Sequence, residues 1–193
     1  MKIKKIENII VHQIFEPVFE SFCFFIASVP LLAQKEFQEL MLNSPNRFGE
    51  LQVHDKGIIK VDLKYVYDYL NKSICLERDG IKTRANFTNA MKTFGRIYAI
   101  SLFNILESSK FNNRINKSEL YQFLKHIRNG SSHGNVFIFK PKEKKKLLAK
   151  PITWKNKKID SSLEGKEVFN SFITCFDLSL IINDLSLEIN SLK

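Results

Sequence analysis

The sequence contains few of the residues that stabilise small secreted domains or bind zinc. Only three of its 193 residues are cysteines, and they are widely separated and odd in number. Cys23, Cys75 and Cys175 each stand among apolar residues, which is typical of reduced, buried thiols in the cytoplasm rather than of a disulfide framework. Their spacing also differs from that of zinc sites.

The chain also lacks a glycine-rich phosphate loop, an internal repeat, a low-complexity tract and a cluster of acidic metal ligands. Kinases and P-loop proteins bind phosphates with glycine-rich loops, and metallonucleases hold their cations with carboxylates. The sequence therefore disfavours these three classes. We expect neither a metal site nor a cofactor.

No apolar run is long enough to cross a bilayer, which takes about 20 consecutive apolar residues. The longest candidate, residues 18–33, contains Glu20 and Pro30. Lys2, Lys4 and Lys5 precede it, as in a signal peptide, but the interruptions disfavour a signal or an anchor. We expect a cytoplasmic protein with no membrane partner.

What the chain does have is a globular composition and an excess of positive charge. Hydrophobic residues make up 44% and charged residues 26% of the sequence, so we expect one folded domain over residues 1–193. Thirty basic residues against twenty acidic ones give a net charge of +10. Such a charge favours polyanions, above all nucleic acid, although a lysine-rich solvated surface explains it equally well.

Apolar residues recur at helical spacing through most of the chain, which predicts an all-α fold. Residues 43–57 lack this periodicity and contain Ser44-Pro45-Asn46, so we expect a loop there. The expected helices are one or two over residues 6–41 with boundaries or kinks at Pro17 and Pro30, one from an N-cap at Asp62, one over 87–106, one capped by Asn116 and Glu119, and one over 164–192.

The helix that begins near Asn116 carries the residues of greatest interest at its end. Leu120, Phe123, Leu124 and Ile127 form a buried stripe, and Arg128 continues it because Leu120, Leu124 and Arg128 are four residues apart. Arg128 is therefore expected to point inward. A guanidinium there needs a partner, a solvent-filled cleft or a subunit interface. His126 faces another direction, and we expect it at the surface or at the rim of the site.

The chain changes character after this helix. Residues 136–139 are β-prone, and Ile152-Thr153-Trp154 follows a lysine-rich connection, so residues 136–160 are expected to form a basic hairpin, loop insertion or lid. Residues 140–158 contain nine lysines and one glutamate, a local charge of +8. Trp154 is expected in the core rather than stacked on a base. The lysines expected to bind RNA are Lys140, Lys142, Lys144, Lys145, Lys146 and Lys150.

Residues 127–136 combine a guanidinium with an imidazole where a helix is expected to stop. Arg128 offers a planar donor fork for phosphate oxygens, and His133 is a general acid or base with a reference pKa near 6.5. RNA supplies its own nucleophile, the 2′-hydroxyl, so these two groups suffice for cleavage without a metal. A helix C-cap with a buried histidine is the competing interpretation, and turn geometry explains Gly130 and Gly134 at least as well as substrate approach does.

The stretch Arg128-Asn129-Gly130-Ser131-Ser132-His133 resembles the signature of the HEPN superfamily, an arginine, four to six residues and a histidine, often with a polar residue after the arginine. The resemblance implies a compact helical bundle, commonly dimeric, and a metal-independent endoribonuclease of toxin–antitoxin, abortive-infection or antiviral systems. It places Arg128 and His133 at the catalytic positions and Asn129 at the polar one. Toxins silenced by adenylylation have a tyrosine where Asn135 stands here, which argues against that control.

The resemblance also implies partners. These are RNA, a second copy of the chain that completes the site, and a cognate antitoxin or other defence partner. Ser131, Ser132 and Asn135 are the remaining polar residues expected to support the site by hydrogen bonds. Two alternatives stay open, namely a non-catalytic HEPN module that binds RNA or protein, and a purely structural role for Arg128 and His133 in the bundle.

Overall fold

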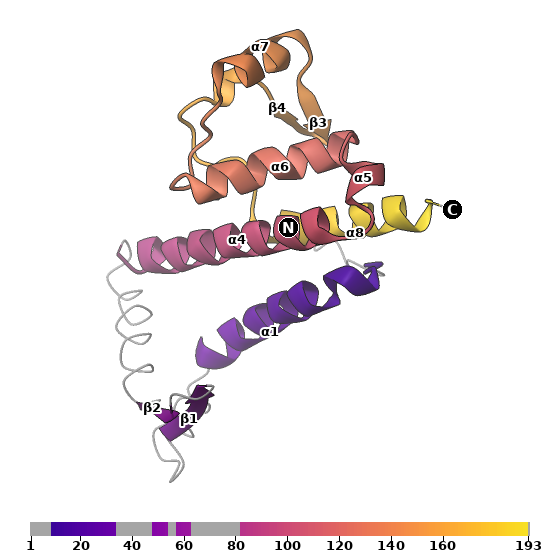
Figure 1. The fold of residues 1–193 in the computed structure, drawn as a ribbon. Helices are drawn as coiled ribbons and strands as arrows, with labels where there is room; N and C mark the ends of the chain where they lie inside the picture. Colours follow the sequence, from indigo (N-terminus) through magenta and orange to yellow (C-terminus); the bar gives the residue numbers. More distant parts are fainter. Residues whose placement is uncertain (1–8, 34–47, 54–56, 63–81, 193) are drawn as a thin grey trace, which may run out of the picture. The chain divides into compact units, whose positions relative to one another are not determined.

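A computed structural model of the protein describes residues 9–33, 48–53, 57–62 and 82–192. These residues are mostly helical, with two small antiparallel hairpins (Figure 1). The prediction of a mainly helical fold is confirmed. The chain forms two compact units, Met1–Phe22 with Ala90–Lys193, and Cys23–Asn89. A single domain over residues 1–193 stays a prediction.

The smaller unit contains a hairpin that the sequence did not predict. Strand β1 (Phe48–Val53) pairs antiparallel with β2 (Gly57–Asp62), and Leu51 lies opposite Ile59. The expectation of a loop over residues 43–57 is therefore wrong for β1, because the backbone of residues 48–53 forms an antiparallel ladder with residues 57–62. Asp62 ends β2, and the helix predicted to start there lies outside the described residues.

Helix α1 (Glu16–Ala33) follows a short 3-10 turn, η1 (Gln13–Phe15). Pro17 is its second residue, where the missing N–H costs no intrahelical hydrogen bond, so the boundary predicted at Pro17 is confirmed. Cys23 is exposed on this helix, and Cys175 is buried and free. The expectation of a buried thiol is thus confirmed for Cys175 and wrong for Cys23, and Cys75 lies outside the described residues.

The larger unit holds the candidate motif in a layered helical core (Figure 1). Helix α6 lies between α4, with Phe103 against Tyr121, and β3, where Thr153 donates two hydrogen bonds to Glu119. The helices and strands of this part are α4 (Lys82–Ser108) from Ala90 onward, α5 (Asn112–Ile115), α6 (Glu119–Ser132), α7 (Pro141–Ala149), β3 (Ile152–Trp154), β4 (Lys157–Ile159), η3 (Ser161–Leu163) and α8 (Cys175–Asn190). Fully buried residues include Leu102, Leu106, Leu124, Ile127, Leu178 and Ile181.

The segment after the motif contains the predicted hairpin and an unpredicted helix. Strands β3 and β4 pair antiparallel, with Ile152 opposite Ile159. Trp154 is buried, packs on Phe123 at 5.4 Å between ring centroids and donates to Asp184 at 2.9 Å. Its predicted place in the core is confirmed, because the indole N–H has found a partner.

Two predicted helix starts are wrong, and in each case a local N-cap sets the residue at which the helix begins. The N-cap of α6 is Ser118, whose hydroxyl accepts from the Tyr121 backbone, and Glu119 binds Thr153 instead of completing a capping box. The last helix begins at Cys175 rather than near residue 164, because Thr174 and Asp177 form a capping box. None of the helices within the described residues is long and apolar enough to cross a membrane.

Candidate active site

Helix α6 extends through most of the predicted motif and ends at its histidine. Arg128 through Ser132 are helical, and the backbone N–H of the C-cap, His133, donates to the carbonyls of Asn129 and Gly130. The helix therefore does not stop just after Arg128, as the glycine and asparagine suggested. His133 stands at its C-terminal end, with an exposed side chain.

Gly130 is required by packing rather than by a helix cap. A Cβ atom on this residue would lie 2.4 Å from Cγ2 of Val168 and 3.2 Å from the carbonyl oxygen of Val136. The structure gives Gly130 no positive φ, in contrast to Gly134 at +74°. The capping interpretation thus holds for Gly134 and is wrong for Gly130, which lets the segment after the motif fold back against α6.

That returning segment is fixed by Asn135. Its backbone is left-handed, with φ of +71°, a conformation that asparagine tolerates better than most residues. Its side chain is buried, accepts from the Phe169 N–H at 2.9 Å and donates to the Phe169 carbonyl at 3.2 Å. Asn135 is therefore occupied by the backbone, which assigns it a structural role rather than a direct contact with substrate.

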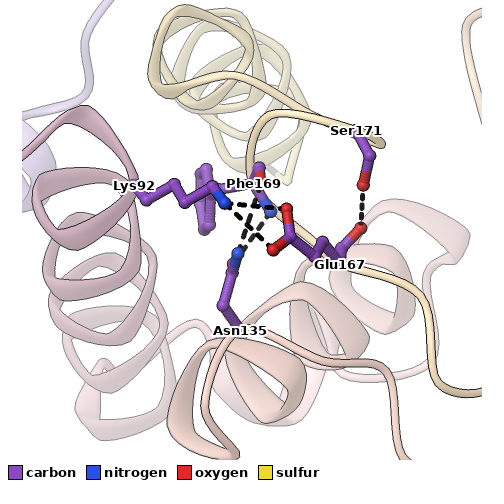
Figure 2. A network of polar contacts seen from close by, with 5 residues as sticks. All are labelled: Lys92, Asn135, Glu167, Phe169 and Ser171. Carbon is purple, nitrogen blue, oxygen red and sulfur yellow. Dashed lines mark hydrogen bonds and ion pairs between the residues drawn. The ribbon is translucent and has the colours of Figure 1, made fainter. Parts of the chain in front are cut away.

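A salt bridge extends this connection to α4 (Figure 2). Lys92 lies 2.9 Å from both carboxylate oxygens of Glu167, and the Ser171 hydroxyl donates to the Glu167 carbonyl. The Phe169 ring packs against Gly95 of α4, where a Cβ would lie 2.6 Å from the ring. A phenylalanine of the segment before α8, and not a neighbouring helix, therefore makes the close approach at Gly95. Together these contacts fix the segment after the motif against α4.

Arg128 is half-buried, as its place in the stripe predicts. Its guanidinium carbon lies 5.5 Å from the centroid of the Phe103 ring, and Nη1 donates to the Asn129 side chain at 3.3 Å. Within residues 9–33, 48–53, 57–62 and 82–192, Arg128 makes no ion pair, and its buried Nε has no hydrogen-bond partner. A cation in this setting retains its capacity to bind an anion.

The other polar residues of the motif divide into buried and exposed ones. The buried Ser131 hydroxyl donates to the Ile127 carbonyl, and the exposed Ser132 hydroxyl donates to the Arg128 carbonyl. Both bonds run back along α6, so neither serine orients His133. Arg128 meets Asn129, but no hydrogen bond links Arg128 to His133 within the described part of one chain.

Most of the lysines predicted to bind RNA lie on or beside α7. The expected loop is wrong for residues 141–149, because Pro141 begins a helix whose third residue, Glu143, accepts from the Lys140 N–H at 3.0 Å. Lys144 is 4.0 Å from Glu164. All six predicted lysines are exposed, namely Lys140, Lys142, Lys144, Lys145, Lys146 and Lys150.

His126 is buried, so its predicted surface position is wrong. Its ring meets the Phe139 ring edge-on at 5.6 Å, because residues 136–140 fold back across α6. Burial lowers the pKa of His126 below 6.5. The negative charge of Glu143 partly raises this pKa again, and the positive charge of Lys125 lowers it further. The imidazole therefore belongs to the core beneath the basic segment.

This lowered pKa predicts a stability that falls in acid. As the pH drops through about 6.5, unfolded chains protonate His126 while folded chains do not, so the free energy of unfolding decreases until the folded pKa is reached. We expect His126→Gln to lack this part of the pH dependence. Urea unfolding at pH 7.5 and 5.5 measures it, and equal losses of stability in the variant and the wild type would contradict it.

Sequence reasoning missed the residues of α4 that meet the motif. Arg96 donates from Nε to the Ser131 carbonyl at 2.9 Å, and Phe103 receives Arg128. Lys92, Arg96 and Phe103 are spaced by four and seven residues, which places them on one helix face. That spacing was visible in the sequence, but nothing local indicated what the face would contact.

Comparisons with models of protein families, with curated proteins and with solved structures found no match.

Proposed function

We propose that the protein is a metal-independent endoribonuclease of the HEPN type, with Arg128 and His133 as catalytic residues. The observation that supports this most directly is the state of Arg128. A half-buried guanidinium with no carboxylate partner in the described residues, and with an unpaired Nε, is costly unless an anion binds it. A phosphodiester is such an anion.

The two side chains supply different parts of one reaction. His133 takes the proton from the 2′-hydroxyl, or gives one to the leaving 5′-oxygen, and Arg128 stabilises the charge that develops on the non-bridging oxygens. The 2′-oxygen bonds to phosphorus as the bond to the 5′-oxygen breaks, so the products are a 2′,3′-cyclic phosphate and a 5′-hydroxyl. Asn129, through its bond to Nη1, orients the guanidinium.

A homodimer supplies what one chain lacks. In one chain, Arg128 leans over Phe103 on α4, whereas His133 is exposed at the end of α6, and no hydrogen bond joins them within the described residues. Motifs from two copies that meet at an interface would bring an arginine of one copy to a histidine of the other. Such a dimer would also place the inward-pointing Arg128 at a subunit interface, one of the three environments in which a guanidinium at this position can stay paired or solvated.

The basic segment provides the attraction for RNA. Five exposed lysines from Lys142 to Lys150 follow the motif on and beside α7, and such a cluster binds the phosphate backbone without regard to sequence. The resemblance further implies a role as a toxin, abortive-infection or other antiviral effector that a cognate partner controls. The exposed lysines alone would equally serve a non-catalytic RNA-binding module, which is the second candidate function.

The chemistry of the products tests the proposal. We expect the purified protein to cleave single-stranded RNA in the presence of EDTA and to leave 2′,3′-cyclic phosphate ends, because the 2′-hydroxyl is the nucleophile. Gel analysis with end-group treatment detects them. The matched control is the same oligonucleotide with 2′-deoxyribose at the cleaved position, which should stay intact there. Products with 3′-hydroxyl ends, or activity that EDTA abolishes, would contradict the proposal, and binding without cleavage would favour the second candidate.

A further inference from the structure

Arg96 lies next to the motif in space although it is far from it in the sequence. It is half-buried on α4, and its Nε donates to the carbonyl oxygen of Ser131 at 2.9 Å. Ser131 stands between Arg128 and His133 in the chain. The last carbonyls of a helix have no intrahelical partner, so Arg96 satisfies one of them at the end of α6 that carries His133.

This hydrogen bond uses only a small part of what Arg96 offers. A guanidinium has five N–H donors in a planar fork, and the bond to Ser131 takes one of them. Within the part of the chain that the structure describes, the two terminal nitrogens of Arg96 have no hydrogen bond or ion pair. Capping of α6 therefore leaves the charge and four donors of Arg96 available.

The neighbouring lysine on the same face of α4 is in a different state. Lys92, one turn away, is neutralised by Glu167 at 2.9 Å (Figure 2), whereas no acidic residue pairs with Arg96 among the described residues. Beyond Arg96 along this face, Phe103 carries the guanidinium of Arg128 at 5.5 Å. Two cations that pair with no carboxylate among the described residues thus lie where α4 contacts the last turns of α6.

We propose that Arg96 binds a second RNA phosphate, adjacent to the one that Arg128 and His133 act on. The inference rests on the proposed ribonuclease function and adds a substrate-binding residue to it. The Nε–Ser131 bond holds the fork in place at the last turn of α6, which ends at His133, and the free terminal nitrogens bind two oxygens of one phosphate. The site therefore prefers RNA with at least two phosphates over a dinucleoside monophosphate.

The experiment measures binding of a single-stranded oligonucleotide with 2′-O-methyl riboses, which cannot be cleaved. The slope of log Kobs against log salt concentration changes by about 0.7 for each phosphate contact with a single strand. We expect Arg96→Gln to reduce the magnitude of the slope by about 0.7, and Arg96→Lys to keep it because the charge remains. Arg114→Gln, which removes an exposed arginine on α5, is the matched control and should keep the wild-type slope.

The outcomes separate the two proposals. If Arg128→Gln lowers the slope and Arg96→Gln does not, Arg96 only caps α6 and the inference fails while the proposed function stands. If the wild type neither binds nor cleaves RNA, the proposed function fails first. Should Arg96→Gln not fold, wild-type affinities decide, since a trinucleoside diphosphate should bind several-fold more tightly than a dinucleoside monophosphate at low salt; equal affinities overturn the inference.

Discussion

Replacement of His133 by alanine is expected to slow RNA cleavage by about 10²–10⁴-fold, the usual contribution of a general acid or base. The side chain is exposed at the end of α6, and its part in the fold is made by the backbone, whose N–H donates to Asn129 and Gly130. Alanine keeps that N–H. The melting temperature should therefore stay close to that of the wild type while the cleavage rate falls.

The matched comparison is Ser132→Ala, next to His133 and also exposed, whose hydroxyl donates to the Arg128 carbonyl. It should cleave RNA at nearly the wild-type rate. Mixing His133→Ala with Arg128→Gln chains tests the composite site, because a mixed dimer can pair the intact arginine of one chain with the intact histidine of the other and regain part of the activity. A fully active His133→Ala variant would remove His133 from the mechanism.

The sequence predicted best those features that depend on periodicity within one helix. Four apolar positions in α6 were enough to aim Arg128 inward, and the structure places it half-buried over Phe103. The same kind of pattern found α4, which extends over Lys82–Ser108. In each case the burial of an apolar stripe is a local property that the chain records directly.

The errors concern residues whose environment comes from distant parts of the chain. His126 was expected at the surface because α6 alone leaves it outside the apolar stripe, but Phe139 covers it. Gly130 looked like a cap because its packing partner, Val168, is far along the chain. Arg96 was not predicted to take part in the site, because its partner, the Ser131 carbonyl, lies 35 residues further along the chain. No single helix contains the information about these contacts.

The capping residues near a helix start also gave wrong helix boundaries where more than one candidate cap was present. Asn116 and Glu119 matched a capping box, but Ser118 caps α6 and Glu119 binds Thr153 of β3. Near the C-terminus, the apolar periodicity extends to residues before 175 and predicted a longer helix. The capping box of Thr174 and Asp177 instead sets the start of α8 at Cys175. A cap contributes about 1 kcal/mol of stability, which is enough to shift a helix boundary. The sequence alone does not show which of several nearby polar residues forms the cap.

Gly130→Ala is expected to destabilise the protein, although the same change in most helices stabilises it by about 1 kcal/mol. The new Cβ would lie 2.4 Å from Cγ2 of Val168 and 3.2 Å from the Val136 carbonyl. Valine is stiff about χ1, and the carbonyl belongs to the backbone, so neither neighbour yields easily. Overpacking of this kind costs about 1–3 kcal/mol, which should exceed the gain in helix propensity and appear in urea unfolding.

A double-mutant cycle with Val168→Ala identifies the cause. Removing Cγ2 eliminates the shorter of the two contacts, so Gly130→Ala should cost less in the Val168→Ala background than in the wild type, with a coupling energy above about 0.5 kcal/mol. Gly134→Asn is the control, since Gly134 has φ of +74° and no atom near its missing Cβ, and asparagine tolerates that backbone. If Gly130→Ala is instead stabilising, the segment after His133 does not pack against α6 as described, and the anchoring of the motif by Val168 and Asn135 loses its basis.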